Sequence, residues 1–314
     1  MDTVEQNFAI ELKHITKTFG PVVANDDISL SVKQGEILAL LGENGSGKTT
    51  LMNMLSGIYH PDSGTIYVRG ERRTIASPHD ALSLGIGMIH QHFKLVDVFT
   101  AQDNIVMGTE KDRRLRKKAL AGEITSLCQK YGLEIDPLKK TYNMSVSEKQ
   151  TVEILKVLYR GADILILDEP TAGLDPKERI RIRNLISDLS QDRIVLIATH
   201  VVSDIEFISK EILLMKNGRL IDKASPEQLQ AKIQGKVFEM SVGQQELEEV
   251  KEKFEISNLF RKDGQIIVRV VTQKRPEGYD EIREAAPTLE DVYLYEFEVK
   301  GAMHNNAVRK IAGT

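Results

Sequence analysis

Short apolar runs alternate with longer segments of helical periodicity along most of the chain. The runs Ile37–Leu41, Ile164–Leu167 and Ile194–Ala198 are uninterrupted and too short for helices, which is typical of strands buried on both faces of a parallel sheet. Between the last two runs, a single apolar helical stripe is predicted from Ile180, Ile182, Leu185, Ile186 and Leu189. Helices between buried strands predict an α/β fold built on a parallel sheet.

The segments around this core predict three further parts. Strand-like stretches at Ile10–Ile15 and Ile28–Val32 indicate an antiparallel β portion at the front of the chain. Helical periodicity predicts an insertion over about residues 92–160. Near Gly235 the composition becomes rich in Glu and Lys with short β runs, so we expect one large domain over residues 1–235 and a small α+β tail over residues 236–314.

Composition and charge exclude several classes of protein. The 314 residues are 41% hydrophobic and 28% charged, which is ordinary for a soluble α/β protein, and the formal net charge of −4 leaves no global basic surface, so no nucleic acid partner is expected. The single cysteine, Cys128, cannot form an internal disulfide, and we expect a reducing, cytoplasmic compartment. No apolar run reaches the roughly 20 residues of a membrane span, so any membrane role requires a partner.

The strongest chemical signal is a glycine-rich loop between the predicted strand Ile37–Leu41 and a predicted helix. Its residues Gly42 to Thr49 fit G-x-x-x-x-G-K-[ST]. Backbone N–H groups of such a loop turn inward on phosphates, the lysine reaches the outer phosphates, and the threonine hydroxyl can ligate Mg²⁺. The candidate nucleotide-binding residues are therefore Gly42, Asn44, Gly45, Ser46, Gly47, Lys48, Thr49 and Thr50.

Polar side chains at the ends of other strands complete a candidate catalytic site. Asp168 and Glu169 end a central strand, where ligands of open α/β sheets collect, so Asp168 can hold Mg²⁺ and Glu169 can polarise an attacking water. Gln91 and His200 also end strands; each alone is as compatible with a structural role, whereas beside the phosphate loop they become candidate Mg²⁺ and γ-phosphate contacts. Phe19 is either a core residue or a stacking platform for a base.

In their order and spacing, these motifs resemble the ATP-binding cassette (ABC) transporter ATPases over residues 8 to about 225. Walker A lies at Gly42–Thr49, Walker B ends at Asp168, the Q-loop is at Gln91, the D-loop ends at Asp175 and the switch histidine is His200. The resemblance implies Phe19 under the adenine of ATP, Thr49, Gln91 and Asp168 around Mg²⁺, Glu169 as general base and His200 at the γ-phosphate. It also implies a second ABC ATPase subunit facing this one.

The family's L-S-G-G-Q signature is altered in this chain. It aligns with Met144-Ser145-Val146-Ser147-Glu148, which keeps only the serine whose hydroxyl meets the partner's ATP. Ser147 replaces a glycine and serves only where its φ is allowed without strain, and Glu148 adds a negative charge near phosphates. The sequence leaves two alternatives: a functional variant of the signature loop, and an inactive one.

Different parts of the chain resemble different branches of the family. The front part, including "GMIHQHFKLVDVFTAQDNIVMG", looks like ATPases of simple-sugar and nucleoside importers, whereas the part from Gly173 onward looks like single-cassette exporter ATPases of the antibiotic-resistance kind. We hypothesise a chimera joined near "DEPTAGLDP", with a natural mixed lineage as the alternative.

Taken together, these features predict an ATP-hydrolysing subunit that energises an integral membrane permease. We expect the subunit to be peripheral on the inner face of the cell membrane, bound through that permease. The expected cargo of the permease is nucleosides or simple sugars. An exporter ATPase and an ATP-binding module without turnover are the alternatives. A cassette protein of translation or DNA repair is disfavoured, because neither a second cassette nor a long coiled-coil arm is visible.

Overall fold

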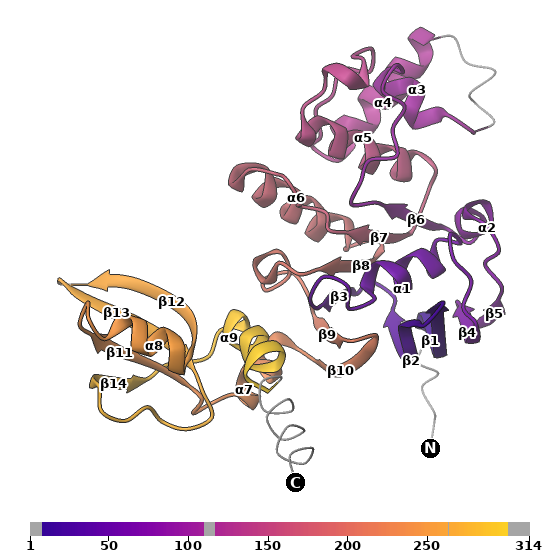
Figure 1. The fold of residues 1–314 in the computed structure, drawn as a ribbon. Coiled ribbons are helices and arrows are strands. Elements are labelled where there is room, and N and C mark those ends of the chain that lie inside the picture. Colours follow the sequence, from indigo (N-terminus) through magenta and orange to yellow (C-terminus); the bar gives the residue numbers. More distant parts are fainter. Residues whose placement is uncertain (1–7, 110–116, 263, 301–314) are drawn as a thin grey trace, which may run out of the picture. The chain divides into compact units, whose positions relative to one another are not determined.

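The computed structural model describes residues 8–109, 117–262 and 264–300, and its internal contacts divide the chain into two compact units, residues 1–222 and 223–314 (Figure 1). This division lies earlier in the chain than the composition change at Gly235, so helix α7 (Pro226–Lys232) belongs to the second unit. None of the helices in the described part of the chain combines the length and the apolar character that a membrane span needs.

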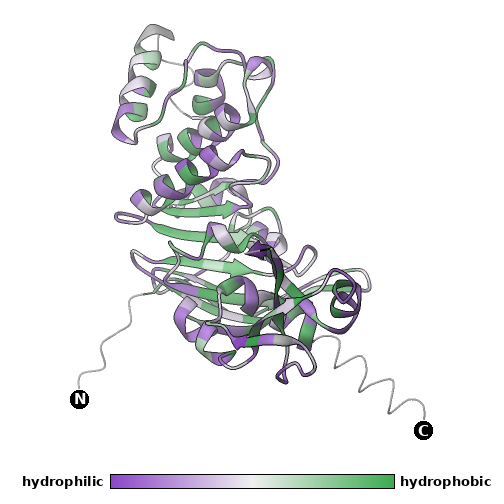
Figure 2. Ribbon diagram, turned by 90° about the vertical axis from the view of Figure 1, so that its left-hand side faces the viewer, coloured by the Kyte–Doolittle hydropathy of each residue, from purple (hydrophilic) through white to green (hydrophobic). Residues whose placement is uncertain are grey.

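The first unit is built on a six-stranded sheet in the order β10–β9–β3–β8–β7–β6, which confirms the predicted α/β fold. The three central strands pair in parallel and are buried along their whole length, as their uninterrupted apolar runs predict; Figure 2 colours these strands as hydrophobic. The strands are β3 (Ile37–Leu41), β6 (Ile86–Ile89), β7 (Ile164–Asp168), β8 (Ile194–Thr199), β9 (Glu211–Lys216) and β10 (Arg219–Ala224).

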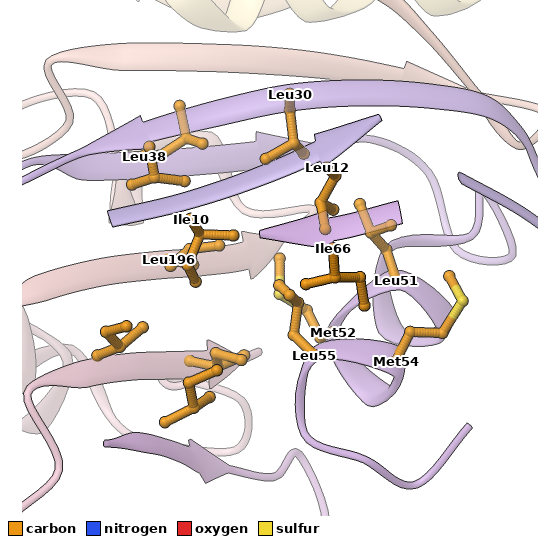
Figure 3. Packing of buried hydrophobic residues seen from close by; sticks show 14 of the residues in the cluster. Ile10, Leu12, Leu30, Leu38, Leu51, Met52, Met54, Leu55, Ile66 and Leu196 are labelled. Atoms are coloured by element: carbon orange, nitrogen blue, oxygen red, sulfur yellow. The ribbon is translucent and has the colours of Figure 1, made fainter. Parts of the chain in front are cut away.

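An antiparallel sheet in the order β2–β1–β4–β5 forms the predicted front portion. Its strands are β1 (Phe8–Phe19), β2 (Val22–Lys33), β4 (Ser63–Val68) and β5 (Glu71–Arg73). One apolar core joins both sheets to helix α1 (Lys48–Leu55): Ile10 and Ile66 of the antiparallel sheet, Leu38 of the parallel sheet and Leu51 of α1 belong to the same buried cluster (Figure 3). This core holds the start of α1 in place.

Between β6 and β7 the chain forms the predicted helical insertion, made of α3 (Ala101–Val106), α4 (Lys117–Lys130) and α5 (Val146–Tyr159) (Figure 1). Short helix α2 (Pro78–Ser83) precedes β6, and α6 (Pro176–Leu189) connects β7 to β8. The stripe expected on α6 is wrong at one position. Ile182 is buried, whereas Ile180 is 50% exposed, because residues two apart on a helix lie on different faces.

The second unit contains a four-stranded antiparallel sheet in the order β12–β13–β11–β14. Its elements are β11 (Val237–Val242), α8 (Leu247–Lys253), β12 (Glu255–Lys262), β13 (Gln265–Val271), β14 (Asp280–Glu284) and α9 (Leu289–Leu294). Alternate residues of β11 and β13, such as Met240 and Val268, form a core with Val250 of α8. The segment "QQELEEVKEKF" contains α8, and "IIVRVV" forms most of β13, in line with the short β runs expected in this part of the chain.

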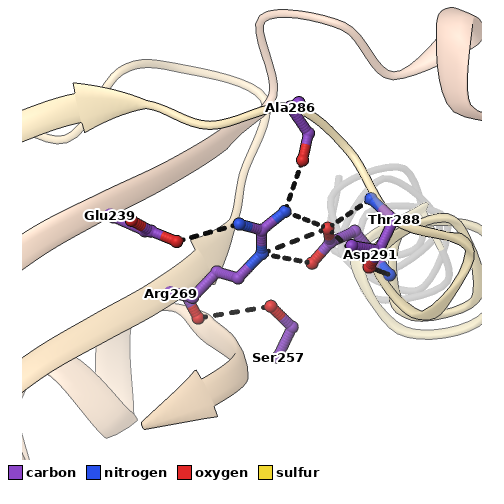
Figure 4. A network of polar contacts seen from close by, with 6 residues as sticks. All are labelled: Glu239, Ser257, Arg269, Ala286, Thr288 and Asp291. Carbon is purple, nitrogen blue, oxygen red and sulfur yellow. Dashed lines mark hydrogen bonds and ion pairs between the residues drawn. The ribbon is translucent and has the colours of Figure 1, made fainter. Parts of the chain in front are cut away.

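A polar network fixes α9 to this sheet. The Arg269 guanidinium donates to the carboxylate of Asp291 at 2.7 Å, to Glu239 at 2.9 Å and to the carbonyl of Ala286 at 2.6 Å (Figure 4). Asp291 also accepts the N–H of Thr288, the N-cap of α9, at 2.8 Å. One buried carboxylate therefore both caps the helix and pairs with the sheet.

Candidate active site

The glycine-rich loop has a backbone that other residues cannot adopt. Gly47, which precedes α1, has φ +101°, and a Cβ added there would lie 2.1 Å from the carbonyl oxygen of Ala24. A Cβ added at Gly42 would lie 2.2 Å from the carbonyl oxygen of Met215. The glycines at both ends of the loop are therefore required by close backbone approach, which lets the loop curl at the end of β3.

Neighbouring elements brace this loop from the side. Asn25 of β2 donates to the carbonyl of Gly47 at 3.2 Å, and the N–H of Gly218 donates to the carbonyl of Ser46 at 3.0 Å. Gly218 belongs to the Asn217–Gly218 turn, where both residues have positive φ, as this dipeptide favours between two strands. The carbonyls of Ser46 and Gly47 therefore point toward these neighbouring elements. The Ser46 hydroxyl is buried and lacks a hydrogen-bond partner among the described residues, so it has capacity for a ligand.

Lys48 lies over the loop it follows. Its Nζ donates to the carbonyls of Gly42 at 2.7 Å and Glu43 at 2.8 Å, and the side chain is 5% exposed. Burial lowers the pKa of Lys48, while the carboxylates of Glu169, Asp168 and Glu43 oppose that shift. The ammonium is thus held at the mouth of the loop by weak neutral acceptors, which an anion can replace.

Thr49 and Asp168 form a pair of oxygen donors beside the loop. The Thr49 hydroxyl donates to Asp168 Oδ1 at 3.1 Å, and Asp168 is 2% exposed at the end of β7. Burial raises the pKa of Asp168, while the hydrogen bond from Thr49 opposes the shift. Hydroxyl and carboxylate oxygens suit Mg²⁺, which keeps several waters and takes other oxygens from substrate phosphates. The donor set therefore fits that ion.

Other kinds of metal centre are not indicated. Over residues 8–109, 117–262 and 264–300, no group of three or more His, Cys, Asp or Glu side chains gathers in a way that could hold a metal ion. A site that shares its ion with substrate phosphates needs no such group.

Glu169 has an unusual backbone and a fully engaged carboxylate. Its φ is +49°, which is uncommon for a residue other than glycine, and the carboxylate is turned toward the end of β8. There Oε2 accepts the Thr199 hydroxyl at 2.9 Å, and Oε1 accepts the N–H of His200 at 3.1 Å. The His200 ring nitrogen Nδ1 lies 2.8 Å from the same oxygen. A strained residue at a site of this kind is consistent with a functional role.

One cavity of about 380 Å³ collects most of the predicted residues. Of the candidates from the sequence, it is lined by Asn44, Gly45, Gly47, Lys48, Thr49, Thr50, Gln91 and Glu169. This volume lies in the range of small-molecule sites. Sequence reasoning missed the lining residues Val22–Ala24 and Asn217–Gly218, as well as Thr199. The Asn-Gly pair is a readable turn signal, but nothing in the sequence places that turn beside the loop.

Phe19 does not line this cavity. Its ring packs edge-on against Tyr59, with 5.1 Å between centroids, and the side chain is 42% exposed. Val22 and Val23, which line the cavity from the same sheet, are also largely exposed.

Ser145 lies at a second cavity, of about 910 Å³, together with Gly173 and Asp175. It is the N-cap of α5 and its hydroxyl accepts the N–H of Glu148 at 3.2 Å. Ser147 lies in the first turn of α5 and is absent from the residues with positive φ, so its backbone carries no strain. Ser147 therefore replaces the family's glycine without backbone strain.

The Glu148 carboxylate is compensated. It accepts two hydrogen bonds from Lys139 Nζ, at 2.6 and 2.9 Å, and one from the N–H of Ser145 at 2.8 Å. Although partial burial acts in the opposite direction, these bonds lower the pKa of Glu148. The negative charge is thus neutralised by a neighbouring lysine within the helical insertion.

Comparisons with known proteins relate the chain to ABC transporter proteins. Residues 25–172 match the family model described as "ABC transporter". The chain is 45% identical over 216 residues to the nucleoside import ATP-binding protein NupA of Lactococcus lactis, which is 68% of this chain and 43% of NupA. It is 51% identical over 187 residues to the guanosine import ATP-binding protein NupO of Bacillus subtilis, which is 59% of this chain and 37% of NupO.

A solved structure shares the fold as well. The cbiO1 protein of Clostridium perfringens, part of the ABC transporter complex cbiONQ, superposes with a TM-score of 0.63 and 27% identity, over 72% of this chain and 92% of cbiO1. The chain thus spans less than half the length of NupA and of NupO but nearly all of cbiO1.

Proposed function

Because the chain contains an ATP-binding domain of the ABC transporter family, we propose that it is the ATP-hydrolysing subunit of a membrane importer of nucleosides or simple sugars. The observation that carries this proposal is the meeting of Lys48, Thr49, Gln91 and Glu169 on one cavity, with Asp168 bonded to Thr49. These residues come from separate segments of the chain, and their functions are complementary.

The glycine-rich loop binds the phosphates of ATP in this proposal. Backbone N–H groups of residues 42–47 and the N-terminus of α1 favour an anion. Lys48 exchanges its two loop carbonyls for the β- and γ-phosphates and gains a charge-assisted bond. Val22 and Val23 offer apolar surface to the base, and stacking of Phe19 on the adenine stays a prediction.

Thr49, Asp168 and Gln91 are the residues that would hold Mg²⁺. When bound there, Mg²⁺ would neutralise the charge that develops on the transferred phosphoryl group. Gln91 follows β6 and leads into the helical insertion, so this ligand belongs to a segment between the sheet and the insertion.

Glu169 is the proposed general base for in-line attack of water on the γ-phosphate, and His200 orients it and contacts that phosphate. The positive φ of Glu169 and its bonds to Thr199 and His200 support this assignment, because a base must be held in one orientation to act. Most of the catalytic effect then comes from positioning and charge stabilisation.

Two such subunits are needed for a complete site. Ser145 lines a different cavity from Lys48, so it meets a γ-phosphate only if that phosphate is held by a second ABC ATPase subunit. With the Glu148 charge compensated by Lys139, we propose a working variant of the signature loop. An unstrained Ser147 supports the same conclusion.

The proposed partner is an integral membrane permease, which would place the subunit on the inner face of the cell membrane. The names of NupA and NupO support import, with nucleosides as the first cargo to test. Export is the alternative outcome of that test.

ATP turnover by the purified chain tests the enzyme assignment. We expect Mg²⁺-dependent hydrolysis that rises more than linearly with protein concentration, and a decrease of at least about 100-fold in Glu169→Gln with ATP binding retained. Glu71→Gln on β5 is the matched control, since Glu71 is exposed and outside the cavity. Tight ATP binding without hydrolysis at any protein concentration would support a module without turnover.

Transport direction needs the permease that co-purifies with the chain. In vesicles with the ATPase facing outward, ATP-driven movement of radiolabelled guanosine from the lumen to the ATP side supports import. Movement away from the ATP side would support the exporter alternative and contradict the proposal.

A further inference from the structure

Helix α5 carries a buried charge that the proposed catalytic site does not use. Glu153 lies about two helical turns beyond Ser145 and its side chain is 0% exposed. Burying a carboxylate in this way is costly unless it is paired and hydrogen-bonded, so its partners indicate its role.

One partner lies in the segment that follows Gln91, and the other, Lys156, lies on α5 itself. Glu153 Oε1 accepts the backbone N–H of Lys94 at 2.7 Å. Both carboxylate oxygens accept Lys156 Nζ, at 3.0 and 2.9 Å, and the same Nζ reaches the carbonyl of Lys94 at 3.3 Å. The peptide groups of Lys94 are thus held on both sides by side chains of α5.

Stability alone does not account for this arrangement. Lys156 is 13% exposed, so both charges are largely desolvated, and a buried ion pair is often no more stabilising than apolar side chains of similar size. What an apolar pair cannot supply is an acceptor for the N–H of Lys94.

We infer that Glu153 is a positioning residue that makes the Gln91–Lys94 segment and helix α5 move as one body. This inference rests on the proposed function. Gln91 contacts Mg²⁺ and nucleotide at one end of the segment, and Glu153 of α5 binds the backbone of Lys94 at the other end. Ser145 lies at the N-terminus of the same helix α5. Nucleotide binding at one cavity is thereby transmitted to the loop that serves the partner's nucleotide.

The test compares two double variants that differ in a single property. Glu153→Leu with Lys156→Met removes both charges and the acceptor for Lys94, whereas Glu153→Gln with Lys156→Met removes both charges but keeps an amide oxygen as acceptor. Tyr159→Phe is the control, because it removes a hydrogen bond of 3.0 Å from α5 to Glu123 that does not involve the Gln91 segment.

Two readouts of the full chain are needed. Steady-state hydrolysis separates kcat from KM: we expect the leucine double variant to lose about tenfold or more in kcat with KM for ATP within about twofold, and the glutamine double variant to stay within about threefold of wild type. Hydrogen exchange measures the link directly. Mg-ATP should protect amides of residues 91–94 in all variants, but those of residues 145–150 only where the acceptor remains.

Equal protection of residues 145–150 in both double variants would overturn the inference. If the leucine double variant does not fold, Lys94→Pro decides instead, because it removes the same hydrogen bond from the loop side; loss of protection at residues 145–150 supports the link and retained protection refutes it. Absence of protection at residues 42–49 of the wild type would contradict the proposed function as well, whereas intact protection there with no difference between the variants contradicts this inference alone.

Discussion

Oε1 of Glu169 lies 2.8 Å from Nδ1 of His200, while Oε2 of the same carboxylate accepts the Thr199 hydroxyl at 2.9 Å. Two consecutive residues at the end of β8 thus hold both oxygens of the proposed base. The Thr199 hydroxyl also accepts the N–H of Val201 at 3.0 Å, so it connects the base to the chain that leads away from the strand. Thr199 is fully buried. A water molecule therefore cannot take over its hydrogen bond to Glu169 without a change in the packing around it.

Thr199→Val should impair hydrolysis without impairing ATP binding. Valine keeps the shape of the side chain and removes the one donor to Oε2 in the described part of the chain, so Glu169 loses orientation while the glycine-rich loop is unchanged. We expect kcat to fall about tenfold or more, with the affinity for ATP within about twofold. Thr199→Ser retains the hydroxyl and should keep most of the activity. Equal kcat in the valine and serine variants would show that Thr199 does not position the base.

Gly47→Ala should abolish tight ATP binding. The added Cβ would meet the Ala24 carbonyl oxygen at 2.1 Å, and this backbone cannot move without displacing β2. We expect a loss of at least about 100-fold in ATP affinity by calorimetry, since the loop amides and Lys48 are displaced together. Gly35→Ala is the control, because φ is +67° but no atom lies within 4 Å of the added Cβ. Its cost should be about 1 kcal/mol of stability with ATP affinity unchanged.

Lys139→Met should weaken the signature loop. The substitution removes the cation that pairs with the Glu148 carboxylate, which is 29% exposed. The unpaired carboxylate then lies next to Ser145, whose N–H it accepts. A residual negative charge near the partner's γ-phosphate costs about 1–2 kcal/mol at intermediate dielectric, so kcat/KM should fall about tenfold. Adding Glu148→Gln to Lys139→Met removes the charge and should restore activity. A Lys139→Met variant with wild-type kcat/KM would show that the compensation is not required.

The sequence could predict the parts of the site that depend on strand ends, and the structure shows why. Thr49 ends the glycine-rich motif that follows β3, and Asp168 ends β7. Because ligands of open parallel sheets collect at the carboxyl ends of the strands, both residues could be expected at the same edge even though β8 lies between the two strands. Thr199 could not be found in this way, because its contact with Glu169 depends on which strand lies next to β7. The neutralisation of Glu148 depends on Lys139 from a preceding loop, which no local pattern places. The chimera stays a hypothesis.

Asp291→Asn should destabilise the second unit in a pH-dependent way. Burial acts to raise the pKa of Asp291, but the hydrogen bonds from Arg269 outweigh it and the pKa is lowered from its ordinary value of 3.8. A lowered carboxyl pKa contributes stability above the ordinary value and loses it as pH falls through the lowered one. We therefore expect Asp291→Asn to cost about 3–5 kcal/mol at pH 7, measured by urea unfolding, and this difference to shrink below about pH 4. Glu248→Gln, from an exposed pair with Lys251, should change stability by less than about 1 kcal/mol at either pH. A difference for Asp291→Asn that is constant from pH 7 to pH 3 would show that the charge of Asp291 does not contribute to the network.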